Sequence, residues 1–188
     1  MNRRILIAVL MIAIGAGGGV LYQRWQAGQT ATPASVTASA AQAPAERPKA
    51  NERRPDFTLP DVEGKPRSIG EWDGKVIVLN FWATWCPPCV REIPALQQLY
   101  ETYQDKGLVV VGVALDTTQS VIDFIDPQGV EYPVLIADQE GPALTSQYGN
   151  RLNVLPYTVV IDRQGNIVYR HRSEITFEEA EKVIRPLL

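Results

Sequence analysis

The feature that most constrains the fold is an apolar run that leads directly into two cysteines. Residues 75–83, with the sequence KVIVLNFWA, are rich in β-branched and aromatic side chains. Such a run is typical of a strand buried on both faces of a sheet. Cys86 and Cys89 follow it, and the apolar residues from Cys89 to Tyr103 recur at spacings of three and four, which predicts a helix. We therefore expect a central strand, a short turn that holds Cys86, and then a helix.

Strands and helices alternate along the rest of the chain. A short hairpin is expected over residues 56–69, a second buried strand (LVVVGVAL) over 108–115, and a strand (YPVLIA) over 132–137. Helices are expected over residues 119–126, 141–148 and 176–185, and a second hairpin over 157–170. This order predicts an α/β domain with a mixed sheet flanked by helices.

The amino-terminal segment has the pattern of a membrane anchor. Arg3 and Arg4 precede an uncharged apolar run over residues 5–22. As a helix this run would be ~27 Å long, close to the ~30 Å of a hydrocarbon core. The small-residue motifs at 38–40 and 41–43 lie too far behind it for a signal peptidase site. We expect residues 1–25 to form an uncleaved signal-anchor with a cytoplasmic amino terminus, and a cleaved signal peptide is the alternative.

Residues 26–54 have the composition of a flexible tether. The segment is rich in Ala, Thr, Ser, Gln and Pro and has almost no bulky aliphatic side chain, so it cannot offset the entropy of ordering. We expect the folded domain to span residues 55–188. Residues 51–188 carry thirteen basic and twenty acidic side chains, which argues against nucleic acid as a ligand.

The two cysteines form a C-x-x-C motif at the predicted junction between strand and helix. They are too few for a structural zinc site, which usually takes four Cys or His ligands. Cys86 would begin the helix, where backbone N–H groups and the helix dipole favour a thiolate. Cys89 would lie one turn further, against the core. The outer sulfur could attack a partner disulfide and the inner one could resolve the mixed disulfide, so we predict a redox-active dithiol rather than a static bridge.

These motifs resemble a known family. The stretch NFWATWCPPC followed by EIP, and the later stretch NVLPYTVVIDRQGNIV, look like the membrane-anchored extracytoplasmic thioredoxin-like proteins of the TlpA/ResA group. The chain is also similar to the thioredoxin-like component of cytochrome c maturation systems. The resemblance runs from about Asp56 to the carboxyl terminus. It implies a thioredoxin fold with an added amino-terminal β-hairpin and a central insertion that includes residues 117–149.

The resemblance also implies roles for individual residues. Cys86 would be the nucleophile and Cys89 the resolving cysteine. Pro156 would be a cis-proline facing them, so that the backbone of Leu155 is turned towards the substrate chain and can pair with it like a strand.

Three further positions follow from the same comparison. Glu92 would lie near the dithiol, assist proton transfer and raise the pKa of the thiols by like-charge repulsion; an exposed first-turn Glu is the alternative. Trp85 would shield the approach to Cys86, or else serve as a structural aromatic. Cytosolic thioredoxins carry a buried Asp where this chain has Asn80, which leaves Glu92 as the nearby proton acceptor.

The predicted activity is reduction of protein disulfides. Pro87 and Pro88 lack backbone N–H groups, so few donors would stabilise a Cys86 thiolate. Because a strongly stabilised thiolate makes the disulfide form a strong oxidant, we expect this site to act as a reductant. We expect no metal or organic cofactor. The expected partners are disulfide-containing extracytoplasmic proteins, such as apocytochrome c with its haem-attachment cysteines, and a membrane electron donor that restores the dithiol. The expected location is the bacterial inner membrane, with the domain facing the periplasm or extracytoplasmic space.

Two other functions are compatible with parts of the pattern. A peroxiredoxin-like peroxidase would need a threonine and a proline before its cysteine; Thr84 is suitably placed, but no proline precedes Cys86 in the loop. A non-catalytic copper-binding or chaperone module could use both thiolates for Cu(I), although no Met-rich or His-rich stretch accompanies them.

Overall fold

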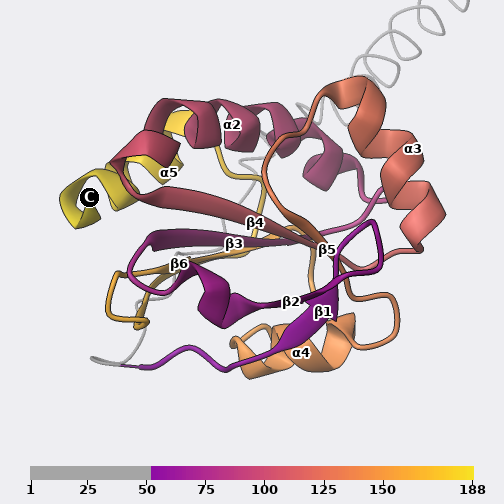
Figure 1. Ribbon diagram of the computed structural model, residues 1–188, viewed down its shortest axis with the longest axis horizontal. Coiled ribbons are helices and arrows are strands. Elements are labelled where there is room, and N and C mark those ends of the chain that lie inside the picture. The colour runs from indigo at the N-terminus through magenta and orange to yellow at the C-terminus, as the bar shows by residue number, and fades with distance from the viewer. Residues whose placement is uncertain (1–51) are drawn as a thin grey trace, which may run out of the picture. The chain divides into compact units, whose positions relative to one another are not determined.

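The domain is built on a five-stranded mixed sheet (Figure 1). The computed structural model describes residues 52–188, so the predicted anchor and nearly all of the predicted tether lie outside the described residues. The strand order is β5-β4-β3-β6-β7. The strands are β3 (Val76–Trp82), β4 (Leu108–Ala114), β5 (Val134–Ile136), β6 (Tyr157–Ile161) and β7 (Ile167–His171). β3, β4 and β5 run parallel, whereas β6 and β7 are antiparallel to their neighbours.

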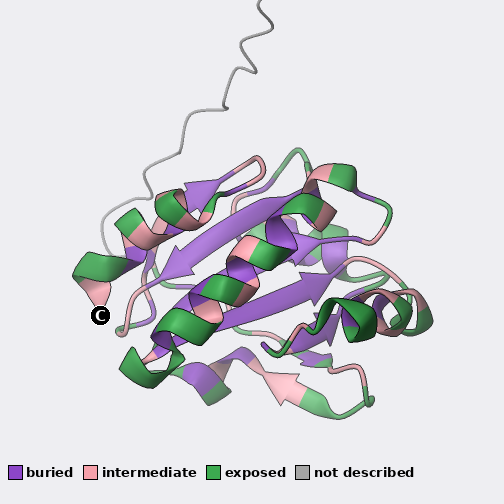
Figure 2. Cartoon of the chain, turned by 90° about the horizontal axis from the view of Figure 1, so that it is seen from above, coloured by how far each residue is buried: buried purple, intermediate pink, exposed green. Residues whose placement is uncertain are grey.

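The predicted central strand is confirmed. Every residue of β3 is buried, and the strand lies between β4 and β6 in the middle of the sheet. Figure 2 shows the same pattern, with buried strands beneath helices whose outward sides are exposed. A run without polar alternation can be accommodated there because both faces of the sheet are covered.

Different elements cover the two faces. One core packs under α2 (Pro87–Tyr103), α3 (Thr118–Gln128) and α5 (Phe177–Ile184). The other packs against the hairpin of β1 (Thr58–Pro60) and β2 (Pro66–Ser68), a short 3-10 helix (Ile69–Trp72) and α4 (Gly141–Gln147). Figure 1 places α2 and α5 on one side of the sheet and α4 with the hairpin on the other. The thioredoxin-like architecture and the amino-terminal hairpin are therefore as expected.

The expected central insertion, residues 117–149, forms α3, β5 and α4. β5 adds to the sheet beside β4, and Asp61 of the amino-terminal hairpin bridges to Leu135 of β5. The insertion and the hairpin therefore extend the same edge of the sheet.

The packed part of the chain includes three residues that the sequence analysis assigned to the tether. The Ile167 N–H donates to the Glu52 carbonyl over 2.7 Å, and the Arg54 N–H donates to Gly165 over 2.9 Å. The buried Arg54 guanidinium also donates to Asp73 over 2.6 Å. Composition did not indicate this boundary because its contacts are with residues far along the chain. Within residues 52–188, no helix is both long enough and apolar enough to span a membrane.

Candidate active site at the amino end of helix α2

Cys86 and Cys89 are joined by a disulfide at the start of α2. Cys86 is the N-cap residue of the helix and 5% exposed, whereas Cys89 is fully buried one turn further on. Pro87 occupies the first helical position, where its missing N–H would have had no helical partner. Both cysteines are therefore buried in the oxidised domain, and the role of Cys86 as the sulfur that a partner attacks stays a prediction.

The loop before Cys86 is held by the end of the neighbouring strand. The carboxylate of Asp116, just beyond β4, accepts hydrogen bonds from the Thr84 N–H and hydroxyl. The Cys86 N–H donates to Ala83 over 3.2 Å. These bonds fix the turn that carries the disulfide out of the sheet. They also engage the Thr84 hydroxyl, the group considered above for a peroxidase.

A cis-proline lies at the same end of the sheet. β3 and β6 are antiparallel and Phe81 pairs with Tyr157, so the residues after Phe81 and those before Tyr157 leave the sheet side by side. The Leu155–Pro156 peptide bond is cis, as the resemblance implied. Pro156 is buried and Leu155 is half-buried. The substrate-contacting role of these two residues stays a prediction.

Trp85 is 66% exposed. It therefore does not serve as a core aromatic, which was one of the two roles considered for it. An indole with this exposure next to Cys86 is available to a docking protein.

Glu92 is buried on α2, three residues after Cys89, rather than exposed on the first turn of the helix. Its Oε1 accepts from Asn80 Nδ2 over 2.6 Å and its Oε2 accepts from the Ile175 N–H over 2.9 Å. Burial raises the pKa of Glu92 to about 8, and these two donors only partly oppose that rise. The carboxyl is therefore mostly neutral at pH 7, so the predicted repulsion of a nearby thiolate would become strong only above about pH 8.

Asn80 connects Glu92 to the adjacent strand. Its Nδ2 also donates to Thr158 Oγ1 over 3.0 Å, because the register of β3 and β6 pairs Asn80 with Thr158. Its Oδ1 is buried and has no hydrogen-bond partner among the described residues. Sequence reasoning found Asn80 and Glu92 but missed Thr158 and Ile175. Thr158 follows Pro156 closely, yet no local pattern pairs it with residue 80, and Ile175 lies 83 residues from Glu92.

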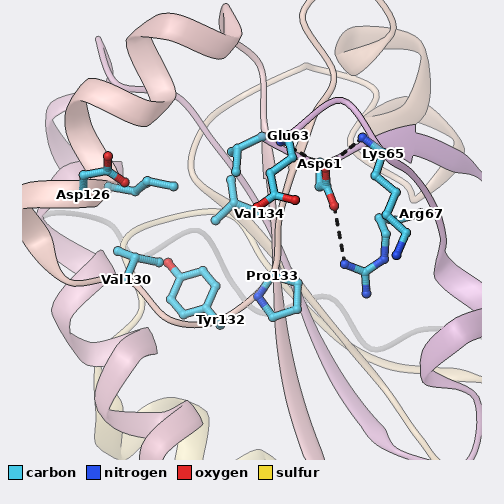
Figure 3. Close-up of a pocket in the computed structure, with 11 residues that line it drawn as sticks. Asp61, Glu63, Lys65, Arg67, Asp126, Val130, Tyr132, Pro133 and Val134 are labelled. Atoms are coloured by element: carbon cyan, nitrogen blue, oxygen red, sulfur yellow. Dashed lines mark hydrogen bonds and ion pairs between the residues drawn. The ribbon is translucent and has the colours of Figure 1, made fainter.

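A separate pocket of about 420 Å³ lies between the amino-terminal hairpin and the segment that connects α3 to β5 (Figure 3). Its lining mixes acidic and basic side chains with apolar ones. The Asp61 carboxylate accepts the Lys65 N–H over 2.9 Å and forms an ion pair with Arg67. None of the residues predicted for the redox site lines this pocket.

Comparison with known proteins identifies the family. The model of the family described as Redoxin matches residues 49–184. The chain belongs to the Redoxin family. A relative in this family, the thiol-disulfide oxidoreductase ResA of Bacillus thuringiensis (strain Al Hakam), is 30% identical over 96% of this chain and 94% of its own. ResA of Halalkalibacterium halodurans is 34% identical over 73% of this chain and 78% of its own.

Solved structures agree with this assignment to the Redoxin family. The thiol:disulfide interchange protein of Chlorobium tepidum TLS, a thioredoxin family protein, superposes with a TM-score of 0.67 at 30% identity and covers 74% of this chain and 98% of its own. The relatives confirm the resemblance to the TlpA/ResA group. These relatives, together with the disulfide at the amino end of α2, identify the chain as an enzyme of the thiol–disulfide oxidoreductase class.

Proposed function

We propose that this enzyme reduces disulfides of extracytoplasmic proteins through Cys86 and Cys89. The observation that carries the proposal is the Cys86–Cys89 disulfide at the amino end of α2, with Cys86 at the N-cap, Cys89 one turn further on and the buried Glu92 carboxyl three residues after Cys89. In such a pair the sulfur at the N-cap is proposed to attack the partner disulfide, and the sulfur one turn further along the helix to resolve the mixed disulfide.

The reaction follows from this geometry. In the reduced enzyme the Cys86 thiolate attacks one sulfur of the partner disulfide, which forms a mixed disulfide and releases the other partner sulfur as a thiolate. Cys89 then loses its proton and attacks Cys86, which forms the Cys86–Cys89 disulfide and releases the second partner thiolate. The partner gains two electrons, which the enzyme dithiol loses.

The ionised fraction of Glu92, which is small at pH 7 and grows towards pH 8, is suited to accept the proton of Cys89. The two residues are three positions apart on α2, a spacing at which side chains meet on one helix face. The pKa of Glu92, raised by burial to about 8, is near the ordinary value of ~8.5 for a thiol. Proton transfer between groups of similar pKa is efficient in either direction, so the same residue serves oxidation and reduction of the pair.

The direction of electron flow is inferred from the donors around Cys86. Pro87 and Pro88 remove two backbone N–H groups from the first turn of α2, and the Cys86 side chain accepts no capping hydrogen bond from that turn. A weakly stabilised thiolate makes the disulfide form less oxidising. Equilibration with defined glutathione mixtures should place the pair near thioredoxin; a potential among the strongly oxidising enzymes would reverse the proposed direction.

The proposed location is the extracytoplasmic face of the inner membrane. Residues 1–25 are proposed as the signal-anchor and residues 26–51 as the tether, because residues 52–54 of the predicted tether pack on the domain. The match to ResA of B. thuringiensis, which covers 96% of this chain, supports the inference because it extends into this segment. An extracytoplasmic reductant needs electrons from a membrane donor, since the compartment is oxidising. Apocytochrome c with oxidised haem-attachment cysteines is the proposed candidate substrate.

Trapping tests the function directly. In Cys89→Ala the mixed disulfide cannot be resolved, so substrates should accumulate covalently bound to Cys86 and be released by a reductant. The matched control is Cys86→Ala, which leaves the buried sulfur and should trap far less. Equal trapping by the two variants, or none by Cys89→Ala in cells that contain oxidised substrate proteins, would contradict the proposal.

A further inference from the structure

Exposed apolar side chains are concentrated at one place in the domain. The large hydrophobic residues exposed within residues 52–188 are Trp85, Leu152 and Val154. Leu152 is 79% exposed and Val154 38%. Trp85 precedes Cys86, and the other two precede the cis peptide of Pro156, so all three lie in the segments that leave the same end of the sheet. Single exposed apolar residues are ordinary, but their gathering around one site marks an interaction surface.

The segment that carries Leu152 and Val154, residues 148–154, is tied down at its base. We call it the fastened loop. The Tyr148 carbonyl accepts from the Tyr157 hydroxyl over 2.8 Å and from Arg170 Nε over 2.9 Å. The buried side chain of Asn150 pairs with both main-chain groups of Val154: its Nδ2 donates to the carbonyl over 2.8 Å and its Oδ1 accepts from the N–H over 3.2 Å.

The tip of the fastened loop is held as well. The Thr145 hydroxyl donates to Asn153 Oδ1 over 2.7 Å, and the Asn153 N–H donates to the Asn150 carbonyl over 3.0 Å. Asn153 has a φ of 49°, a left-handed conformation in which Asn is among the better tolerated side chains. Leu152 is therefore exposed on a loop in which Asn150 before it and Asn153 after it are held by hydrogen bonds.

A rigid loop with an apolar tip is suited to binding. A surface loop that only connects α4 to β6 gains nothing from a leucine that is 79% exposed. When a partner covers that leucine, apolar area leaves water at ~25 cal/mol per Å². Because the loop is already ordered, little of this free energy is lost in fixing its conformation.

We propose that the fastened loop selects substrates by the apolar side chains that flank their reactive cysteine. The inference rests on the proposed function and names its substrate class: extended polypeptide segments with a bulky aliphatic or aromatic residue two positions from the reactive cysteine. The segment must be extended because Cys86 is only 5% exposed, so that a partner's sulfur reaches it on a narrow approach. In an extended chain, residues two positions apart point to the same side, so a side chain beside the cysteine can meet Leu152.

Two matched disulfide peptides test the proposal. Both carry a fluorophore released on reduction; one has Leu at the positions two before and two after the cysteine, and the other has Ser there. The full-length reduced enzyme should reduce the Leu peptide about tenfold faster, which corresponds to partial burial of one leucine. In Leu152→Ser this ratio should fall to about twofold. Each rate is divided by the same variant's rate with hydroxyethyl disulfide, which is too small to reach the loop.

The control variant is Leu188→Ser. Leu188 is half-buried at the opposite end of the sheet, where its carbonyl accepts from Arg163 over 2.8 Å, and this variant should keep the wild-type ratio. A ratio near one for the wild-type enzyme, or a ratio unchanged in Leu152→Ser, would overturn the proposal while leaving disulfide reduction intact. Failure to reduce hydroxyethyl disulfide and both peptides would instead refute the proposed function. If light scattering showed that Leu152 holds a dimer of this chain which Leu152→Ser dissociates, the loop would be a self-association surface and the proposal would be wrong.

Discussion

Replacement of the buried carboxyl by its neutral isostere, Glu92→Gln, should stabilise the oxidised enzyme in a pH-dependent way. Burial raises the pKa of Glu92 from 4.5 to about 8. Below pH 4.5 the carboxyl is protonated in both the folded and the unfolded chain. Between pH 4.5 and 8 the unfolded chain ionises while the folded one stays protonated, so stability falls as pH rises, by about 1.4 kcal/mol per pH unit. Above about pH 8 both states are ionised and the loss is complete.

Glu92→Gln has no carboxyl at this position, so its free energy of unfolding does not fall with pH in this way. Relative to wild type, Glu92→Gln should gain about 1 kcal/mol at pH 5, about 3 kcal/mol at pH 7 and about 5 kcal/mol at pH 8.5 in the free energy of unfolding, offset by a constant that reflects packing. The glutamine can still form two hydrogen bonds at this position. Its carbonyl can accept from the Ile175 N–H, and its amide can donate to Asn80 Oδ1, which now lacks a partner, once the Asn80 amide rotates.

Guanidinium chloride unfolding followed by tryptophan fluorescence at these three pH values measures the effect. The protein is kept oxidised so that Cys86 and Cys89 do not titrate. Glu101→Gln, an exposed position on the same helix, is the matched control and should differ little from wild type at any pH. A difference between Glu92→Gln and wild type that stays constant from pH 5 to 8.5 would refute the reasoning, because it would mean that Glu92 is ionised to the same extent in both states.

Three further outcomes are expected. Glu92→Gln should slow the second step of exchange, the release of a preformed mixed disulfide, by about a hundredfold below pH 8, measured by stopped-flow with a chromogenic leaving thiol. Thr158→Val should lower the free energy of unfolding by about 1 kcal/mol, since it removes an acceptor of Asn80 Nδ2. Thr158→Ser keeps the hydroxyl and should lose much less stability. Equal losses for the two variants in urea titrations would argue against the hydrogen bond. Gly112→Ala should destabilise by ~1–3 kcal/mol in thermal unfolding, because the added Cβ would lie 3.1 Å from Trp82 Nε1 on the crowded face under α2.

Much of the architecture could be predicted from local patterns. The apolar run over residues 75–83 indicated β3, and the positions of Cys86 and Pro87 indicated the start of α2, because strands and helices impose periods that short segments display. The placement of Cys86 at the N-cap and of Cys89 one turn further along the helix followed from the same periodicity. The boundary of the domain did not, since Glu52 and Arg54 are ordered by bonds to the β6–β7 turn rather than by their own composition.

The sequence by itself determined the order of the elements, the pair of sulfurs at a strand–helix junction and the presence of an acid one turn below them. Only the tertiary structure decided that this acid is neutral at pH 7, because its pKa depends on burial and on donors from Asn80 and from Ile175, which is distant in the chain. It also decided that Leu152 is presented to solvent rather than buried. Charge state and exposure depend on which residues meet in three dimensions, and no local pattern records that.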